Sequence, residues 1–222
     1  MPDFFEEKKS YEESIQWLRE QLAVLPLEHI RCVPQKHKLL IHHNRSYAFR
    51  LPLPLPSLPD SAAGLPQYVA HIPTEIPPYI LLLAQAGAAA MGYFEGGEVV
   101  EHKTIKKYMK RHKSGKAQIT YLNQKGKSKA GSRIRLANTL RFFEEINQRM
   151  DTWCKCYQPR RILYSCGPQL WGLMFRSKVA PPFEKKDPRL LKIPLHVHTP
   201  NHQELLRINE QLCCGLLSPT EL

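Results

Sequence analysis

The stretch "YILLLAQAGAAAMGYFEGGEVVEHKTI", residues 79–105, decides the fold of this chain. It contains three runs that are typical of strands, at residues 79–85, 88–94 and 98–105, and the turn Glu95-Gly96-Gly97 separates the last two. Short runs of this kind, separated by glycine-containing turns, are typical of neighbouring antiparallel strands. We therefore predict an antiparallel meander.

The sequence after the meander alternates between helix and strand patterns. A helix that Ser132 can cap carries an apolar stripe for the core at Ile134, Ala137, Leu140, Phe143, Ile146 and Met150. A strand over 161–166, a helix over 168–175, a strand over 192–199 and a helix from Thr199-Pro200 to about Gly215 follow. Such alternation favours parallel pairing. The predicted fold class is α/β, with a mixed sheet that has an antiparallel meander and a βαβ-type C-terminal half.

The N-terminal part, residues 1–75, has a different composition. Ser10 and Glu13 form a capping-box pattern ahead of a helix. Two short apolar runs, residues 38–43 and 46–51, can pair as strands, and a proline-rich stretch, residues 51–66, is expected to be an extended edge or connector. We predict two parts, residues 1–75 and 76–222, of which the first either forms a separate element or completes the same fold.

The positive charge of the chain lies in one segment. The formal net charge is +12, from 32 Lys and Arg against 20 Asp and Glu. Residues 102–143 contain 13 basic and no acidic residues, which leaves 19 basic and 20 acidic residues, or −1, in the rest. Solvated helix faces usually mix both signs, so an acid-free segment indicates a polyanionic partner, with nucleic acid as the first candidate.

The centre of this segment is expected to be a long functional loop around a single glutamine. Gly115, Gly126 and Gly131 punctuate residues 112–132, and Gly115 precedes Gln118 by three positions. The loop contains no carboxylate and no cysteine, and no phosphate-binding glycine motif follows a strand. A glutamine is not a base at neutral pH, but it can orient water or a ribose hydroxyl. Peptidyl-tRNA is a substrate that fits, because it has an activated ester, a neighbouring 2′-hydroxyl and a phosphate backbone for cations to hold.

The cysteines and histidines do not form a metal-binding pattern. None of the six cysteines belongs to a C-x-x-C pair, and His196-x-His198 lacks further ligands in sequence. We expect reduced thiols, no metal and no cofactor. The chain shows neither a signal peptide nor an apolar run of the length that a membrane span requires, so the prediction is a cytoplasmic protein that does not bind membranes.

The basic segment and its flanks resemble the Vms-like release factors, which are the ankyrin and zinc-finger type factors of ribosome quality control and their stand-alone prokaryotic relatives. The joint pattern is G-x-x-Q followed by A-G-S-x-[IL]-R-x-x-N. The matching positions are Glu101, His102, Lys103, Tyr108, Arg111, Lys113, Gly115, Gln118, Ala130, Gly131, Ser132, Arg135 and Asn138. The chain departs from the usual Gly-Gly-Ser-Gln at Lys116-Ala117, and we expect none of the zinc finger, ankyrin repeats and coiled coil of the eukaryotic members within its 222 residues.

The resemblance implies a fold like the catalytic middle domain of eukaryotic and archaeal class 1 release factors. It also implies an enzyme, a peptidyl-tRNA hydrolase of the release-factor type, that acts on stalled peptidyl-tRNA at the large ribosomal subunit. Gln118 would be the catalytic residue, and Gly115, Gly131 and Ser132 would set the loop geometry. Contacts to tRNA and rRNA would come from the basic residues Lys110, Arg111, Lys113, Lys116, Lys125, Lys127, Lys129, Arg133 and Arg135.

Two alternatives stay open at this point. Ester hydrolysis is the first expectation, whereas in-line attack by a 2′-hydroxyl would instead cut the 3′ end of the tRNA. A non-catalytic module that binds rRNA or tRNA would need the cations but not Gln118. Away from the ribosome the protein is expected to be a monomer.

Overall fold

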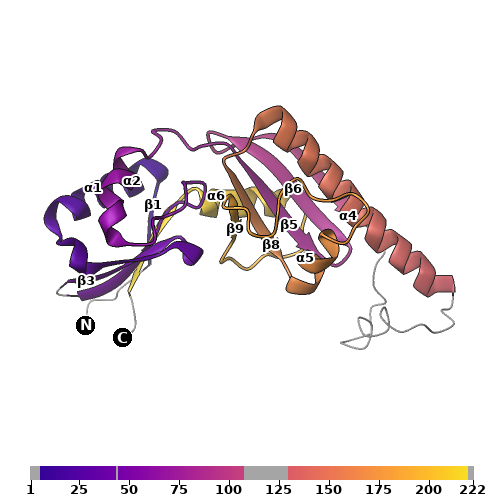
Figure 1. Cartoon of the computed structure of the whole chain (residues 1–222), viewed down its shortest axis with the longest axis horizontal. Coiled ribbons are helices and arrows are strands. Elements are labelled where there is room, and N and C mark those ends of the chain that lie inside the picture. The colour runs from indigo at the N-terminus through magenta and orange to yellow at the C-terminus, as the bar shows by residue number, and fades with distance from the viewer. Residues whose placement is uncertain (1–5, 44, 108–129, 220–222) are drawn as a thin grey trace.

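The computed structural model describes residues 6–43, 45–107 and 130–219 (Figure 1). For residue 45 and residues 130–137 it describes the backbone only. Within these ranges the strands form two five-stranded sheets, one in the middle of the chain and one built from both ends. The chain is therefore an α/β protein, as predicted.

The central sheet has the order β7-β6-β5-β8-β9 and is mixed. Strand β5 pairs antiparallel with β6 and parallel with β8, β6 pairs antiparallel with β7, and β8 pairs parallel with β9. The strands are β5 (Tyr79–Gln85), β6 (Ala88–Glu95), β7 (Glu98–Lys106), β8 (Arg161–Cys166) and β9 (Leu190–Lys192). The meander and the parallel half were both predicted correctly. Gly96 and Gly97 have φ values of 57° and 89°, which explains why glycines form the turn between β6 and β7.

A helix covers each face of the central sheet. Side chains on one face of β5, including Ile80 and Leu82, pack in a core with residues of α4 (Ala130–Tyr157). Side chains on the other face, including Tyr79 and Leu81, pack with residues of α6 (His202–Leu212). Alternate residues of a strand point to opposite faces, so a strand that is apolar throughout is buried on both. A shorter helix, α5 (Pro168–Met174), follows β8 and joins the α4 core.

The second sheet is antiparallel throughout, with the order β1-β10-β4-β3-β2. Its strands are β1 (Glu7–Lys9), β2 (Ile30–Val33), β3 (Lys38–His43), β4 (Arg45–Arg50) and β10 (Gly215–Pro219). Side chains of α1 (Tyr11–Val24) and α2 (Leu65–Ala70) share a core with it. Strand β10 reaches this sheet directly after α6, so the C-terminal end of the chain completes the N-terminal sheet (Figure 1).

The capping box at Ser10 is confirmed. Its hydroxyl accepts from the Glu13 backbone N–H at 3.2 Å, and the Glu13 carboxylate accepts from the Ser10 N–H at 2.7 Å. The two orphan N–H groups at the start of α1 are thereby satisfied.

The proline-rich stretch is a connector whose leucines fill both cores. Leu51 and Leu55 are buried in the N-terminal core, whereas Leu53 is buried in the core between the central sheet and α6. The Leu53 N–H donates to the Leu212 carbonyl at 2.9 Å. Proline at every second position keeps the segment from pairing as a strand, and the leucines between the prolines are the side chains that it buries. The segment therefore joins the two parts of the molecule by packing as well as by chain connection.

Two boundary predictions in the C-terminal half are wrong. The strand expected over 192–199 ends at its first residue, since β9 stops at Lys192. Pro194 lacks an amide donor, and the Gln85 side chain donates to the Val197 and His198 carbonyls at 3.0 and 2.8 Å in place of a neighbouring strand. The last helix begins at His202, because Asn201 and not Thr199 provides the N-cap.

A close contact at Gly215 provides a test of the join between the two ends of the chain. A Cβ at Gly215 would lie 2.3 Å from Ser14 Oγ and 2.8 Å from the Phe49 ring. We expect Gly215→Ala to lower the free energy of unfolding by about 1–3 kcal/mol through overpacking. Gly172→Ala is the control, because nothing lies within 4 Å of its added Cβ and the site is helical. Urea unfolding measures both, and equal midpoints for Gly215→Ala and the wild type would contradict this packing.

Candidate nucleic-acid interface

The basic segment lies between the end of β7 and the beginning of α4. Strand β7 ends at Lys106 and α4 begins at Ala130. Gln118, the loop residue Gly115 and the predicted contacts in residues 108–129 lie outside the described residues; these contacts are Lys110, Arg111, Lys113, Lys116, Lys125, Lys127 and Lys129. Gly131, Ser132, Arg133 and Arg135 lie in the first turns of α4, of which the backbone alone is described. The helix begins two residues before Ser132, so Ser132 is inside the helix and does not precede it as a cap would.

Helix α4 carries its first turns beyond the sheet. Its 28 residues correspond to about 42 Å at 1.5 Å per residue, whereas the seven residues of β5 extend over about 23 Å. Figure 1 shows the helix crossing one face of the sheet and continuing past its edge. The predicted residues at the start of the helix are therefore presented away from the packed body of the protein.

Glu101 on β7 holds the C-terminal half of α4 against the sheet. Its carboxylate accepts from Trp153 Nε1 at 2.7 Å and from the Tyr157 hydroxyl at 2.6 Å, and Arg149 Nη1 lies 3.7 Å away. The hydrogen bonds from Tyr157 and then Trp153 lower the pKa of Glu101. Tyr157 also stacks on Tyr93 of β6, with ring centroids 4.2 Å apart. Glu101 therefore fixes one of the two elements that flank the basic segment.

The next residue of β7 makes its contact on the opposite face. The His102 ring stacks on His202 of α6 at 3.9 Å. Neighbouring residues of a strand point to opposite faces, so Glu101 and His102 together contact the helices on both sides of the sheet. This gives a structural reason for two positions of the sequence pattern that the sequence alone could match but not explain.

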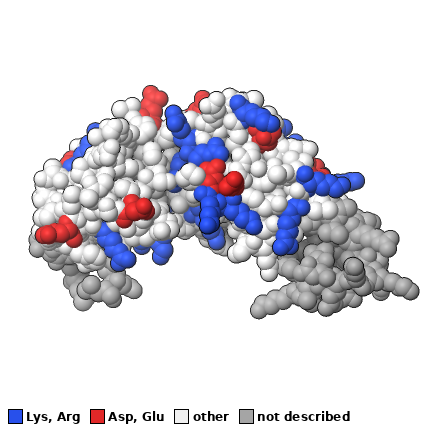
Figure 2. All heavy atoms as spheres, viewed as in Figure 1, with Lys and Arg blue, Asp and Glu red and all other residues white. Residues whose placement is uncertain are grey.

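The cations at the base of the segment are mostly unpaired. Lys107 forms an ion pair with Glu145 of α4 at 2.6 Å, and its N–H donates to the Gly87 carbonyl at 2.9 Å. No carboxylate among the described residues forms an ion pair with Lys103, Lys106 or Arg141. Figure 2 shows blue side chains on the surface that borders the grey residues. Unpaired cations beside the segment suit a polyanionic partner.

Within residues 6–43, 45–107 and 130–219, no group of three or more His, Cys, Asp or Glu side chains is placed to hold a metal ion. None of the helices in those ranges has the length and apolarity to cross a membrane.

Comparison with known families decides what kind of protein carries this arrangement. The sequence model of the family described as the Bacteroidetes VLRF1 release factor matches residues 79–217. The chain belongs to this family. The match begins at the first residue of β5 and ends within β10, so the VLRF1 region comprises the whole central sheet, both covering helices and the basic segment.

Curated relatives of this VLRF1 chain carry the name tRNA endonuclease. The tRNA endonuclease ANKZF1 of Homo sapiens is 32% identical over 136 residues, which are 60% of this chain and 19% of that protein. The tRNA endonuclease vms1 of Schizosaccharomyces pombe is 30% identical over 124 residues, 54% of this chain and 20% of that protein. The aligned region thus spans about a fifth of each relative. A solved structure titled Vms1 mitochondrial localization core aligns with 96% of this chain and 85% of that one, at 12% identity and a TM-score of 0.48.

The Glu101 contact can be tested by a substitution at that position. In Glu101→Ala the Trp153 indole, which is 1% exposed, loses its acceptor, so the free energy of unfolding should fall by about 1–3 kcal/mol at pH 7. Glu98→Ala, an exposed position on the same strand, is the control and should match the wild type. The folded pKa of Glu101 is lowered, so its contribution is present above its ordinary pKa of 4.5 and is lost as the pH falls through the folded value. The difference between wild type and Glu101→Ala should therefore shrink in acid; a difference that grows below pH 4 would refute it.

Proposed function

We propose that this protein cuts stalled peptidyl-tRNA on the large ribosomal subunit and so frees the nascent chain. The observation that carries the proposal is the VLRF1 family match across the whole central sheet, together with an acid-free basic segment that contains Gly115 and Gln118. Residues 76–222 would be the catalytic part. Lys and Arg side chains around Gln118 would hold the tRNA and rRNA backbones, because guanidinium and ammonium groups neutralise phosphates.

Gln118 would act by position and not by ionisation. Its amide both donates and accepts hydrogen bonds, so it can orient a hydroxyl in line with a reacting centre. The substrate then supplies the nucleophile. The loop sequence contains no Asp, Glu or Cys that would act as a nucleophile or general base.

Of the two chemical routes, cleavage of the tRNA itself is favoured by the name that the relatives share. A ribose 2′-hydroxyl attacks the adjacent phosphorus, the bond from phosphorus to the 5′ oxygen breaks, and the hydroxyl proton ends on that oxygen. The tRNA body then carries a 2′,3′-cyclic phosphate, and the released peptide carries CCA with a 5′-hydroxyl. No water is consumed in this step.

Ester hydrolysis is the second candidate, supported by the description of the family as a release factor. Water would attack the ester carbonyl, the acyl–oxygen bond would break, and the products would be a free peptide carboxylate and a tRNA with an intact CCA end. The products therefore distinguish the two routes.

A release assay on purified ribosomes that carry stalled peptidyl-tRNA tests the role of Gln118. We expect Gln118→Ala to slow release by about 100-fold or more, because a misplaced nucleophile loses alignment with the reacting centre. Gln124→Ala is the matched control in the same segment and should release at the wild-type rate. Gel analysis of the RNA and peptide ends identifies the route. Full activity of Gln118→Ala would leave a non-catalytic RNA-binding module as the remaining interpretation.

The role of the cations can be tested separately by salt dependence. Lys113→Ala should weaken binding to the ribosomal complex and lower the slope of log affinity against log salt by about 1, as expected for one lost phosphate contact. Lys155→Ala is the control, since this lysine lies in the last turns of α4 and already pairs with Asp151 at 2.6 Å. Equal slopes for wild type and Lys113→Ala would argue against a phosphate contact at Lys113.

A further inference from the structure

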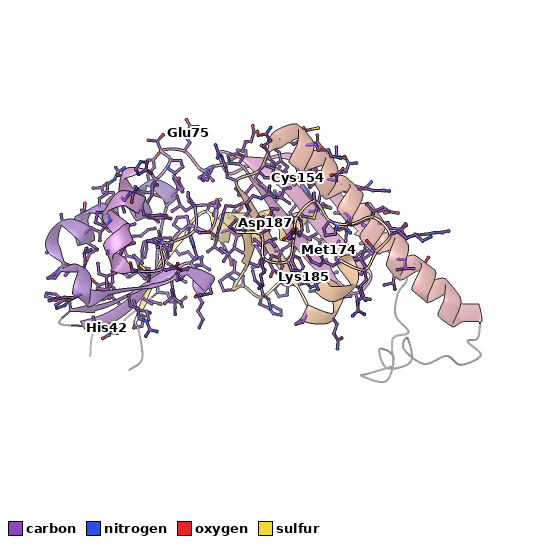
Figure 3. The ribbon with its side chains drawn as sticks, viewed as in Figure 1. His42, Glu75, Cys154, Met174, Lys185 and Asp187 are labelled. Atoms are coloured by element: carbon purple, nitrogen blue, oxygen red, sulfur yellow. The ribbon has the colours of Figure 1, made fainter. Side chains whose placement is uncertain are left out.

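A cleft of about 780 Å³ lies at the junction between the N-terminal part and the central sheet. Its walls come from the proline-rich connector, the segment before β5, and the starts of β8 and β9. Residues that line it include Pro56, Ser57, Glu75, Arg160, Arg161 and Pro188. In Figure 3, Glu75 is labelled near the gap between the two parts, and Asp187, the neighbour of Pro188, near the middle of the view. The volume is in the range of small-molecule sites.

The cleft is positively charged. Arg160, Arg161 and Arg189 line it, and Glu75 is the one carboxylate among the lining residues, which gives +3 against −1; because Asp187 pairs with Arg189, the net charge is +1 with histidine neutral. Arg189 is held by Asp187 in a two-point pair, with Nε 3.0 Å from Oδ1 and Nη2 2.7 Å from Oδ2. Arg160 is exposed and forms no ion pair with the described residues.

Arg161 is the unusual member of this group, because it is buried without a counter-charge. Only 3% of it is exposed, and its Nη1 donates to Ser57 Oγ at 2.6 Å and to the Pro188 carbonyl at 3.3 Å. Its Nε has no hydrogen-bond partner, and among the described residues no carboxylate pairs with it. A buried cation without an anion is costly, so a built site of this kind indicates an anion from outside the chain.

The titratable groups near Arg161 do not neutralise it. Burial lowers the pKa of Arg161 to about 10. Burial and then the charge of Arg161 lower the pKa of the fully buried His37 to about 3, so His37 is neutral at pH 7. The charge of Arg50 also lowers the pKa of His37, and burial lowers the pKa of Arg50 itself.

Much of the remaining wall is apolar and rigid, beside the polar side chains of Ser57, His71 and Thr74. Five prolines and Ile76 line the cleft, and each proline ring has a fixed φ and no N–H group that needs a partner. Guanidinium groups match the geometry of phosphate oxygens, and flat apolar walls suit the face of a base or ribose. We propose that this cleft binds a nucleoside phosphate, with Arg160 and Arg161 on the phosphate and the proline wall against the nucleoside, supplied either as a free nucleotide or as a nucleotide of single-stranded RNA.

The cleft is separate from the basic segment. It lies at the end of the central sheet where β5, β8 and β9 begin. Strand β7 leads into the basic segment at the opposite end of the sheet, beside the end of β5 and the start of β6. The length of β5, about 23 Å, separates these two ends of the sheet. The proposal therefore goes beyond the proposed function and does not depend on it.

Calorimetric titration of the full chain with adenosine 5′-monophosphate tests the free-nucleotide source. We expect binding that weakens by about tenfold or more in Arg160→Ala, as for one lost charge-assisted hydrogen bond. Arg160 is the chosen position because it is exposed, so its removal leaves the core intact. Arg176→Ala is the matched control: it removes another exposed arginine that does not line the cleft, and it should bind like the wild type.

The RNA source is tested by photo-crosslinking a single-stranded RNA hexamer that contains 4-thiouridine. Crosslinks in the peptides that contain residues 71–78, 160–161 or 188–189, lost in Arg160→Ala and retained in Arg176→Ala, would support the proposal with RNA as the source even if the mononucleotide does not bind. Absence of both mononucleotide binding and cleft crosslinks would overturn it, as would equal losses in Arg160→Ala and Arg176→Ala. Gln118→Ala should bind the nucleotide normally, so failure here and failure of the release assay are distinguishable.

Discussion

The burial of β5 on both of its faces is the constraint on which the rest of the structure depends. Because α4 covers one face and α6 the other, the strand is fixed as the middle of the sheet, with the meander on one side and the parallel strands on the other. This arrangement determines which segments lie at each end of the sheet along the strand direction. The turn from β5 to β6 lies at one end of the sheet, together with the end of β7, where the basic segment begins. The starts of the parallel strands lie at the opposite end, beside the arginine cleft.

Helix α4 connects this core with the chemistry. The second half of the helix is anchored by Ile146, Met150 and Trp153 in the core and by Glu101, and the first turns continue in the same direction beyond the sheet (Figure 1). The basic segment is therefore attached to an anchored helix on one side and to a paired strand on the other. The Lys107–Glu145 pair joins the two attachments directly.

The sequence was informative where one local pattern has one physical interpretation. The apolar run of β5, the glycines before β7 and the Ser10 capping box each predicted the observed element. It failed where a tertiary partner decides. The segment after Lys192 has strand-like alternation, but Pro194 and the side chain of Gln85 keep it irregular. The site showed the same division: a charge count located the basic segment, whereas the cleft joins Pro56, Glu75 and Arg161, whose proximity depends on the tertiary fold.

The cations beside the basic segment and the buried arginine of the cleft differ in solvent exposure, and this difference separates their expected roles. Lys103, Lys106 and Arg141 are on the surface, where salt screens their attraction for phosphates over a Debye length of about 8 Å. Arg161 is almost fully desolvated, so its attraction for an anion is screened far less and acts over a short range. Exposed cations suit a long, variable polyanion such as tRNA or rRNA, whose binding weakens as salt rises. A buried, pre-positioned guanidinium suits one phosphate in one orientation, and its binding should depend much less on salt.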